Sequence, residues 1–445
     1  MHTDDTTRAD ISIITNDENQ SLLHHLDFCQ TQGGKVYLQR YLWEPLHTIS
    51  AIRERQQSLQ FLIDALPSWP SIITNGTLMM IEKFLNNSVD AIPTSPNLFS
   101  SLSYKIFSSA DYALIQFTLK HLQDFVKGLQ QFISLFKDKD LPTPLALITN
   151  KIKILLHKKV IEEMICLSGD IKKLPAYKAL SYARFAKNDY KQSLMELCEL
   201  WYQTDAFYSM AYATLQFGFC FPEISTSSEP ELGIHQLWHP LVPGPVAYDI
   251  SLVPDQNFLF LTGANMAGKS TFIKAVGVAA YLAHVGMGVP AKQMKISLLD
   301  GLLTNIQVSD NIVKGESYFF NEVQRIHHTL MKINDGKKWL VLIDELFKGT
   351  NIQDAMKCST AVIEGLVHLD NVLFILSTHL YEIGDGLRLF PNILFRYFET
   401  TSSNTQLIFN YQLKEGISND RIGYLILQRE GVVALLDKMK TATIR

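Results

Sequence analysis

The glycine-rich segment at residues 263–271 constrains the fold of this chain more than any other feature. It follows the pattern of a glycine, four residues and then Gly-Lys-Ser/Thr, between an apolar run at 258–261 and a helix-like run at 272–285. A strand, a glycine loop and a helix start form a cradle in which backbone N–H groups and the helix N-terminus face phosphate oxygens. The segment therefore predicts a nucleotide-binding α/β domain. The residues of the predicted loop are Gly263, Ala264, Asn265, Met266, Ala267, Gly268, Lys269, Ser270 and Thr271.

Two acidic side chains complete the predicted site. Lys269 is placed to reach the β- and γ-phosphates, and the Ser270 hydroxyl is placed to bind Mg²⁺. The apolar run at 339–343 predicts a strand buried on both faces of a parallel sheet, and it ends in Asp344-Glu345. Asp344 would hold the Mg²⁺ shell, and Glu345 would polarise an attacking water as a general base. A solvated acid after a strand is the alternative for Glu345.

A second apolar run, at 371–376, predicts a strand that brings His379 to the same site. Ligands of open α/β sheets bind outside the C-terminal ends of the strands. We therefore expect His379 to lie close to the bound phosphates. A structural histidine is the alternative.

These motifs resemble those of the MutS family of DNA mismatch repair ATPases, a branch of the ABC-type ATPases. The pair Asn265-Met266 inside the loop is characteristic of MutS. Further similar segments lie at 238–241, 303–312, 315–322, 344–351, 377–379 and 411–416. The resemblance is weaker in the N-terminal half, where it implies an all-helical core and lever domain over residues 1–225. Over residues 226–445 it implies an ABC-type P-loop ATPase domain of α/β fold that ends in a helical dimerisation segment.

The resemblance also implies a reaction and an assembly. ATP and Mg²⁺ would be the cofactors, and the reaction would convert ATP and water to ADP and phosphate. Ser317 lies in the segment similar to the family's signature motif. It would reach the γ-phosphate bound by the other subunit of a homodimer, so that ATP binding closes the dimer. His379 would be the switch histidine.

The sequence departs from the family pattern at several points. Ala267 stands where a second glycine is usual, and Phe347-Lys348 stands where Gly-Arg is commoner. The segment 245–247 lies near the position expected for an adenine-stacking aromatic residue, and Tyr248 is the available substitute. The sequence starts where the MutS core starts, so we expect neither the domain that inserts a Phe beside a mismatch nor the connector domain.

Residues 20–225 read almost entirely as helix. Heptad spacing runs from Ile115 to Phe136 and again from Leu194 to Leu215. Each of these apolar stripes, here called a seam, needs a partner helix to cover it. The simplest arrangement is a lever in which the two helices run antiparallel and pack their seams against each other. Two ordinary core helices are the alternative. The segment 137–176 between them is too short for the β-rich clamp that the resemblance implies, so we expect a clamp that is absent or reduced to a helical hairpin.

A group of lysines in that segment offers candidate contacts to DNA phosphates. The members are Lys151, Lys153, Lys158 and Lys159. Acidic side chains follow the last two lysines one helical turn later, which would neutralise them locally. A solvated helix face is therefore the alternative.

Composition narrows the classes of function. The net charge of −4 argues against a broadly basic nucleic-acid coat. We find no apolar run long enough to span a bilayer and no signal-peptide pattern, so we expect a cytoplasmic protein without a membrane contact. The five cysteines form no CxxC pair, so we predict neither a zinc site nor a disulfide framework.

The sequence therefore predicts an ATP-hydrolysing, MutS-like homodimer. Two hypotheses remain for what its ATP-driven closure acts on. In the first, the protein binds DNA in repair or recombination without a Phe wedge. In the second, it is an ATP-dependent switch that binds another protein and does not bind DNA directly.

Overall fold

The computed structural model describes residues 1–445 except 16, 87–91, 168–170, 308–317, 404–405, 419–426, 429–430 and 444–445. Contacts divide the chain into two units. Unit 1 consists of Met1–His25, Glu44–Arg53 and Gln216–Arg445, and unit 2 consists of Leu26–Trp43 and Glu54–Leu215. Helix and strand together build unit 1, whereas the described part of unit 2 is helical.

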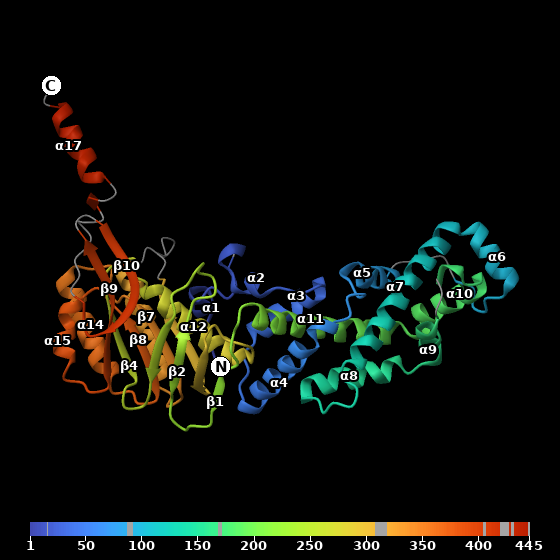
Figure 1. Ribbon diagram of the computed structural model, residues 1–445, viewed down its shortest axis with the longest axis horizontal. Coiled ribbons are helices and arrows are strands. Elements are labelled where there is room, and N and C mark those ends of the chain that lie inside the picture. The colour runs from blue at the N-terminus through green and yellow to red at the C-terminus, as the bar shows by residue number, and fades with distance from the viewer. Residues whose placement is uncertain are drawn as a thin grey trace. The chain divides into compact units, whose positions relative to one another are not determined.

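Unit 2 is organised around helix α7, as Figure 1 shows. Its helices are α3 (Gln32–Trp43), α4 (Ile49–Ala65, which begins in unit 1), α5 (Asn75–Asn86), α6 (Leu98–Phe107), α7 (Ser109–Ser134), α8 (Thr143–Leu156), α9 (Lys159–Cys166), α10 (Ala176–Arg184) and α11 (Lys191–Gln216). The heptad positions of α7 are buried from Ile115 to Ile133, as the spacing predicts. Helices α5, α6, α8, α9 and α10 pack against α7.

The two predicted seams do not pair along their lengths. Helix α7 meets α11 where Phe132 and Trp201 pack edge to face, with ring centroids 5.8 Å apart. Most of the α7 seam is covered instead by α5, α9 and α10. Thr204 is a polar residue at one of the heptad positions between Leu194 and Leu215. Its hydroxyl has a hydrogen-bond partner within α11, because Thr204 Oγ1 donates to the Leu200 carbonyl at 2.7 Å. The alternative of core helices in a bundle describes these contacts better than a lever pair.

The segment at 137–176 contains α8 and α9, and its described residues contain no strand. Both helices pack against α7. A helical hairpin in place of a β-rich clamp therefore stays a prediction for this segment.

Unit 1 contains two sheets. The larger has the order β10-β9-β4-β8-β7-β6, with every neighbouring pair parallel except β10 and β9. Its strands are β4 (Phe258–Thr262), β6 (Gly301–Asn305), β7 (Trp339–Asp344), β8 (Val372–Ser377), β9 (Ile393–Ser403) and β10 (Gln406–Glu415). The smaller sheet has the order β1-β5-β2-β3. Its strands are β1 (Glu223–Ser225), β2 (Leu232–Leu237), β3 (Tyr248–Leu252) and β5 (Gln293–Ser297).

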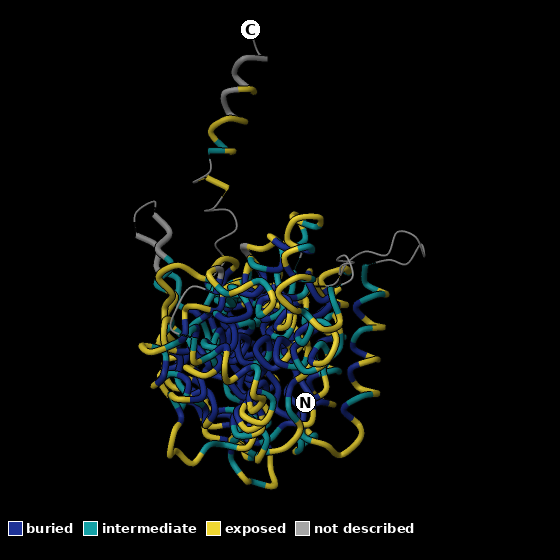
Figure 2. Tube along the Cα trace, turned by 90° about the vertical axis from the view of Figure 1, so that its right-hand side faces the viewer, coloured by how far each residue is buried: buried dark blue, intermediate teal, exposed yellow. Residues whose placement is uncertain are grey.

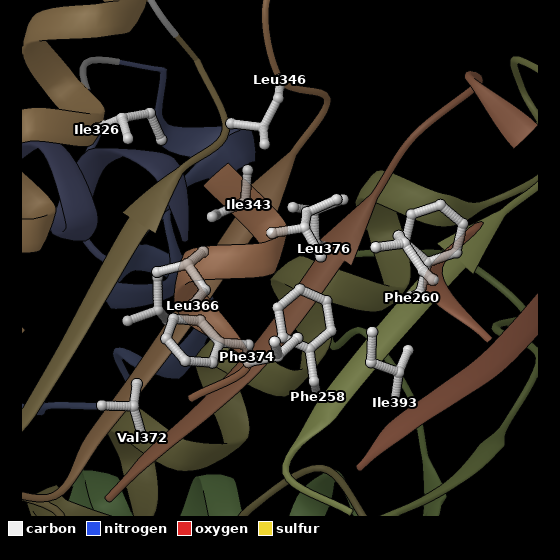
Figure 3. Packing of buried hydrophobic residues seen from close by; sticks show 14 of the residues in the cluster. Phe258, Phe260, Ile326, Ile343, Leu346, Leu366, Val372, Phe374, Leu376 and Ile393 are labelled. Atoms are coloured by element: carbon white, nitrogen blue, oxygen red, sulfur yellow. The ribbon is translucent and has the colours of Figure 1, made fainter. Parts of the chain in front are cut away.

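Helices cover both faces of the larger sheet. Helix α12 (Lys269–Val285) is almost entirely buried and contacts β7 and β8 of the larger sheet and β2 of the smaller one. Helices α13 (Tyr318–Ile333) and α14 (Ile352–Leu366) contribute to the main core cluster. Alternate residues of the strands, including Phe258, Phe260 and Phe374, supply the sheet side of this cluster (Figure 3). Burial on both faces explains why these strands read as continuous apolar runs.

The N-terminal residues lie with unit 1, which differs from the predicted helical domain of residues 1–225. Helix α1 (Asp5–Asp10) packs on β6. The buried Asp10 carboxylate accepts hydrogen bonds from Thr304 Oγ1 at 2.6 Å and from the Ile306 amide at 3.0 Å. Arg325 of α13 meets Asp4 at 2.9 Å. These polar contacts join residues that are about 300 positions apart, so no local sequence pattern indicates them.

The C-terminal helix α17 (Val432–Thr443) exposes apolar side chains at Val432, Leu435 and Leu436. Figure 2 shows this exposed helix beside the label C. Within the part of the chain that the structure describes, no helix has both the length and the apolar character needed to cross a membrane.

Candidate nucleotide site

The predicted phosphate loop connects β4, near the middle of the larger sheet, to the start of α12. Gly263 and Gly268 have φ values of +142° and +107°, a region that favours glycine. A Cβ at Gly263 would lie 3.2 Å from the Phe398 backbone oxygen, and one at Gly268 would lie 3.3 Å from Tyr411 Cδ1. Both glycines are therefore required by backbone conformation and by close packing.

Lys269 begins α12, and its side chain folds back over the loop. Its ammonium group donates to the carbonyl oxygens of Gly263 at 2.7 Å and Ala264 at 3.1 Å. Burial lowers the pKa of Lys269, and the nearby carboxylates of Glu345 and Asp344 oppose that effect. The cation is thus held inside the loop, where it can transfer its hydrogen bonds to phosphate oxygens.

The two predicted metal ligands lie together at the end of β7. The Ser270 hydroxyl donates to one oxygen of the Asp344 carboxylate, and the Ser377 hydroxyl donates to the other. Hydroxyl and carboxylate oxygens are ligands that suit Mg²⁺. Ser377 was not among the predicted site residues. Its signal is strand register, because β7 and β8 place it directly opposite Asp344.

Glu345 is held between two basic side chains. Its Oε2 lies 3.1 Å from Lys348 Nζ and 3.7 Å from His379 Nδ1. The His379 ring, followed by Lys348 and Lys269, lowers the pKa of Glu345 to about 2 against the opposing effect of burial. The carboxylate is therefore ionised, as a general base requires.

Lys269, Ser270 and Glu345 line a cavity of about 420 Å³. From the loop it is lined by Ala264, Asn265, Met266, Gly268, Lys269, Ser270 and Thr271, and from elsewhere by residues that include His239, Tyr248, Glu345 and Tyr411. Gly263 shapes the loop, and Ala267 is buried. The cavity joins the predicted phosphate loop to aromatic side chains at its edge.

Two tyrosines at this cavity differ in their freedom to contact a ligand. Tyr248 is buried, with its ring edge-on to Phe272 and Phe398 at centroid distances of 5.5 Å. Tyr411 remains 40% exposed and lies at a bulge in β10 with φ +51°. The sequence analysis proposed Tyr248 as a base-stacking residue and did not single out Tyr411. Because a bulge cannot be seen in the strand pattern, only the fold indicates Tyr411.

A buried glutamate links the turn after β7 to α13. Glu322 accepts hydrogen bonds from the backbone amides of Lys348 at 3.0 Å and Gly349 at 3.1 Å. The Phe319 and Phe347 rings pack beside this link with centroids 5.7 Å apart. The turn that carries Glu345 is therefore attached to the helix that begins within the segment similar to the family's signature motif.

Comparison with known proteins supports the resemblance to the MutS family over most of the chain. Residues 6–315 match the family model described as MutS domain III, and residues 259–436 match the one described as MutS domain V. The chain belongs to the MutS family. It is 31% identical to human MutS protein homolog 4 over 49% of this chain and 24% of that protein. It is 29% identical to the DNA mismatch repair protein MutS of Thermotoga maritima over 55% of this chain and 30% of that protein.

A third relative is the DNA mismatch repair protein MutS of Pseudothermotoga lettingae, which is 28% identical over 52% of this chain and 28% of that protein. The aligned part thus spans less than a third of each of these curated relatives. The matches establish the MutS family for this chain. They leave the activity and partners of the whole protein as proposals.

The remaining predicted contacts of this MutS-family protein are Ser317 and four lysines of unit 2. Ser317 lies outside the described residues. In unit 2, Lys151 forms an ion pair with Glu196 of α11, and Lys153, Lys158 and Lys159 are exposed. Exposure agrees equally with a DNA contact and with a solvated face, so these lysines remain candidate contacts.

Proposed function

We propose that this MutS-family protein binds and hydrolyses ATP with Mg²⁺ at the cavity around the 263–271 loop. The observation that carries the proposal is the convergence of Lys269, Ser270, Asp344 and Glu345 at one cavity edge from two separate segments, the 263–271 loop and the end of β7. Phosphoryl transfer depends mainly on positioning and charge stabilisation, and these are the groups that supply both.

Each residue has a role in this proposal. Lys269 contacts the β- and γ-phosphates, while Ser270 and Asp344 hold Mg²⁺, which neutralises charge on the phosphate oxygens when it is bound. Glu345 orients and polarises the attacking water, and His379 positions Glu345 by its contact with Oε2. Tyr411 provides the exposed ring on which a base can stack.

We further propose that two copies share each site, with Ser317 of one subunit at the γ-phosphate held by the other. The resemblance of residues 315–322 to the family's signature segment supports this role for Ser317. The exposed apolar side chains of α17 favour an assembly larger than a monomer. ATP then forms contacts across the interface that ADP lacks, and this difference in binding free energy favours the closed dimer.

Replacing Glu345 with Gln tests the proposed ATPase. We expect Glu345→Gln to lower turnover by about 10²–10⁴-fold, the usual contribution of a general base. It should retain nucleotide binding, because Lys269 and the loop are unchanged. The matched control is Glu364→Gln, which changes an exposed glutamate of α14. Steady-state phosphate release and fluorescent-nucleotide titration give the two readouts, and unchanged turnover in Glu345→Gln would remove Glu345 from this role.

We propose DNA as the target of the closure, in repair or recombination. The test is fluorescence-anisotropy binding to matched duplex, mismatched duplex, four-way junction and single strand. Each DNA is titrated without nucleotide, with ADP and with a non-hydrolysable ATP analogue, at two salt concentrations. We expect salt-dependent binding that changes with nucleotide, because phosphate contacts release counterions. Absence of binding in every state would favour the protein-interaction switch.

A further inference from the structure

Helix α6 presents its apolar side outward. Five large apolar residues in this short helix are highly exposed: Leu98 by 79%, Phe99 by 85%, Leu102 by 56%, Ile106 by 62% and Phe107 by 85%. Surface helices normally turn such a stripe towards the core. A contiguous exposed apolar face on a soluble protein marks an interaction site.

The fold fixes which side of α6 faces outward. Ser101 and Tyr104 are buried on the inner side, where α6 packs against α10 and α7 (Figure 1). At 3.6 residues per turn, Leu98, Phe99, Leu102 and Ile106 occupy about 100° of the opposite side.

The helix start is also well defined. Asn97 Oδ1 accepts from the Ser100 amide at 2.9 Å, and Ser100 Oγ accepts from the Asn97 amide at 3.1 Å. This reciprocal cap secures two of the otherwise unsatisfied donors at the helix start. The outward face is therefore presented by a capped and packed helix.

The charge of this face limits the kinds of molecule that can bind to it. Lys105 is the charged residue of α6, and its ammonium lies 5.6 Å from the centroid of the Tyr112 ring on α7. The outward apolar residues thus carry neither the basic cluster that DNA phosphates attract nor the basic face typical of helices on anionic lipid. A neutral apolar face can meet an identical face without repulsion between like charges.

The area of the face agrees with a protein–protein contact. A whole aromatic side chain supplies about 150–250 Å² and an aliphatic one somewhat less, so the four side chains of this face, which are 56–85% exposed, present on the order of 500 Å². Two copies would bury roughly 1,000 Å² in total, the size at which a specific interface begins. Self-complementary patches on identical chains pair across a twofold axis, which is the commonest arrangement of oligomers.

We propose that the outward face of α6 binds the same face of a second copy of this chain. The contact is formed by Leu98, Phe99, Leu102 and Ile106 from each copy, with the two helices packed across a twofold axis. It lies in unit 2 and is a different surface from the nucleotide site of unit 1. It therefore goes beyond the proposed ATPase, and either proposal can fail without the other.

Cross-linking of the full chain tests this contact. The variant Leu102→Cys places a thiol at the middle of α6, where an antiparallel pair across a twofold axis brings this one residue next to its own copy. The exposed Cys166 is replaced by Ser in all samples. With a short bis-maleimide reagent, we expect Leu102→Cys to form covalent dimer at least tenfold faster than Leu147→Cys, a control on α8 where the native leucine is 66% exposed. Equal rates would overturn the proposal.

A second substitution separates the contact from chance collisions. Adding Phe99→Glu to Leu102→Cys places a charged side chain in the apolar contact and should abolish cross-linking, whereas adding Leu147→Glu should not. Circular dichroism checks that each variant is folded, as expected for exposed positions. Persistent cross-linking with Phe99→Glu would overturn the proposal.

The same sample distinguishes this contact from the nucleotide site and from other occupants. Cross-linking should persist in a Lys269→Ala background without nucleotide, because α6 belongs to unit 2. Matched duplex DNA and vesicles of anionic phospholipid should not compete with it. Loss of the cross-link in the Lys269→Ala background, or competition by DNA or vesicles, would overturn the assignment to a second copy.

Discussion

Glu345 combines a strained backbone conformation with close contacts between its carboxylate and two basic side chains. Its φ of +64° and that of Phe347 at +59° lie in the left-handed region that residues with a Cβ seldom occupy. Such strain persists where surrounding structure holds it, often at functional sites. Here the surrounding contacts are Lys348 and His379 on the carboxylate and Phe319 on the Phe347 ring.

The charge environment of Glu345 predicts a pH-dependent contribution to stability. The pKa of Glu345 is about 2 in the folded protein, against about 4.3 in an unfolded chain. A lowered folded pKa stabilises the protein above the unfolded value, and that stabilisation is lost as pH falls towards 2. We expect Glu345→Gln to lower the free energy of unfolding by roughly 2–3 kcal/mol at pH 7.

Urea unfolding at pH 7, 5 and 3.5 measures this effect. The difference between the wild type and Glu345→Gln should shrink below pH 4.5, whereas Glu364→Gln should resemble the wild type at each pH. A difference that stays constant from pH 7 to 3.5 would show that Glu345 is not held ionised by its neighbours.

At the scale of elements, the contact between α13 and the turn after β7 couples two parts of the proposed site. A Cβ at Gly349 would come 2.7 Å from the Phe319 amide nitrogen, so the turn and the helix meet at backbone distance. Glu322 secures this approach with two hydrogen bonds. Because α13 begins one residue after Ser317, a displacement of the helix would be transmitted to the turn that bears Glu345.

Substitution of Glu322 should therefore reduce catalysis more than nucleotide binding. Glu322→Ala removes the acceptor of two part-buried amide hydrogen bonds, each of which contributes about 0.5–1.5 kcal/mol. We expect kcat to fall about 10–100-fold, because each loss of roughly 1.4 kcal/mol in transition-state stabilisation lowers the rate tenfold. The nucleotide Kd should change by less than about threefold.

Glu322→Gln is the conservative counterpart, because its amide oxygen can still accept one of these bonds. It should recover part of the lost kcat. Glu364→Ala is the control on an exposed glutamate. An equal loss of kcat in the Ala and Gln variants, or a loss confined to Kd, would contradict a positioning role for Glu322.

At the scale of the whole molecule, neither of the two compact units is one continuous stretch of the chain. Unit 1 takes in two N-terminal segments, and unit 2 is inserted between parts of it. The hydrogen bonds from α1 to β6 and the bond from the Leu46 amide to the His284 carbonyl, at 2.7 Å, join these segments to the rest of unit 1.

The proposed assembly predicts that inactive subunits complement one another. Ser317→Arg blocks the contribution to the partner's site, and Lys269→Ala disables a subunit's own phosphate loop. A mixed dimer retains one site with an intact Lys269 and an intact Ser317. We expect ATP turnover in the mixture to exceed that of both parents and to reach at most half of the wild-type value per dimer.

Steady-state ATPase assays across mixing ratios measure this complementation. Mixing each variant with itself serves as the control. If every ratio merely averages the two inactive parents, the shared site would lose its support.

The sequence alone was enough to predict the phosphate loop, the buried strands β4, β7 and β8, and the family. These features are local: glycine spacing, apolar runs and the residues at strand ends are set within a few positions. Parallel strands then bring Lys269, Asp344 and Glu345 together, because their C-terminal ends share one edge of the sheet.

Only the tertiary structure showed that Ser377 bonds Asp344, that Glu322 bonds the turn after β7 and that Tyr411 lines the cavity. It also showed that α1 lies on β6 and that α7 is covered mainly by helices other than α11. Each of these contacts depends on strand register, a bulge or the choice among several apolar helix faces. Apolar spacing says that a face is buried without specifying its partner, and an isolated polar residue has no periodicity. Packing of the whole chain selects among those possibilities, because burial of each face must be satisfied together with every buried hydrogen bond.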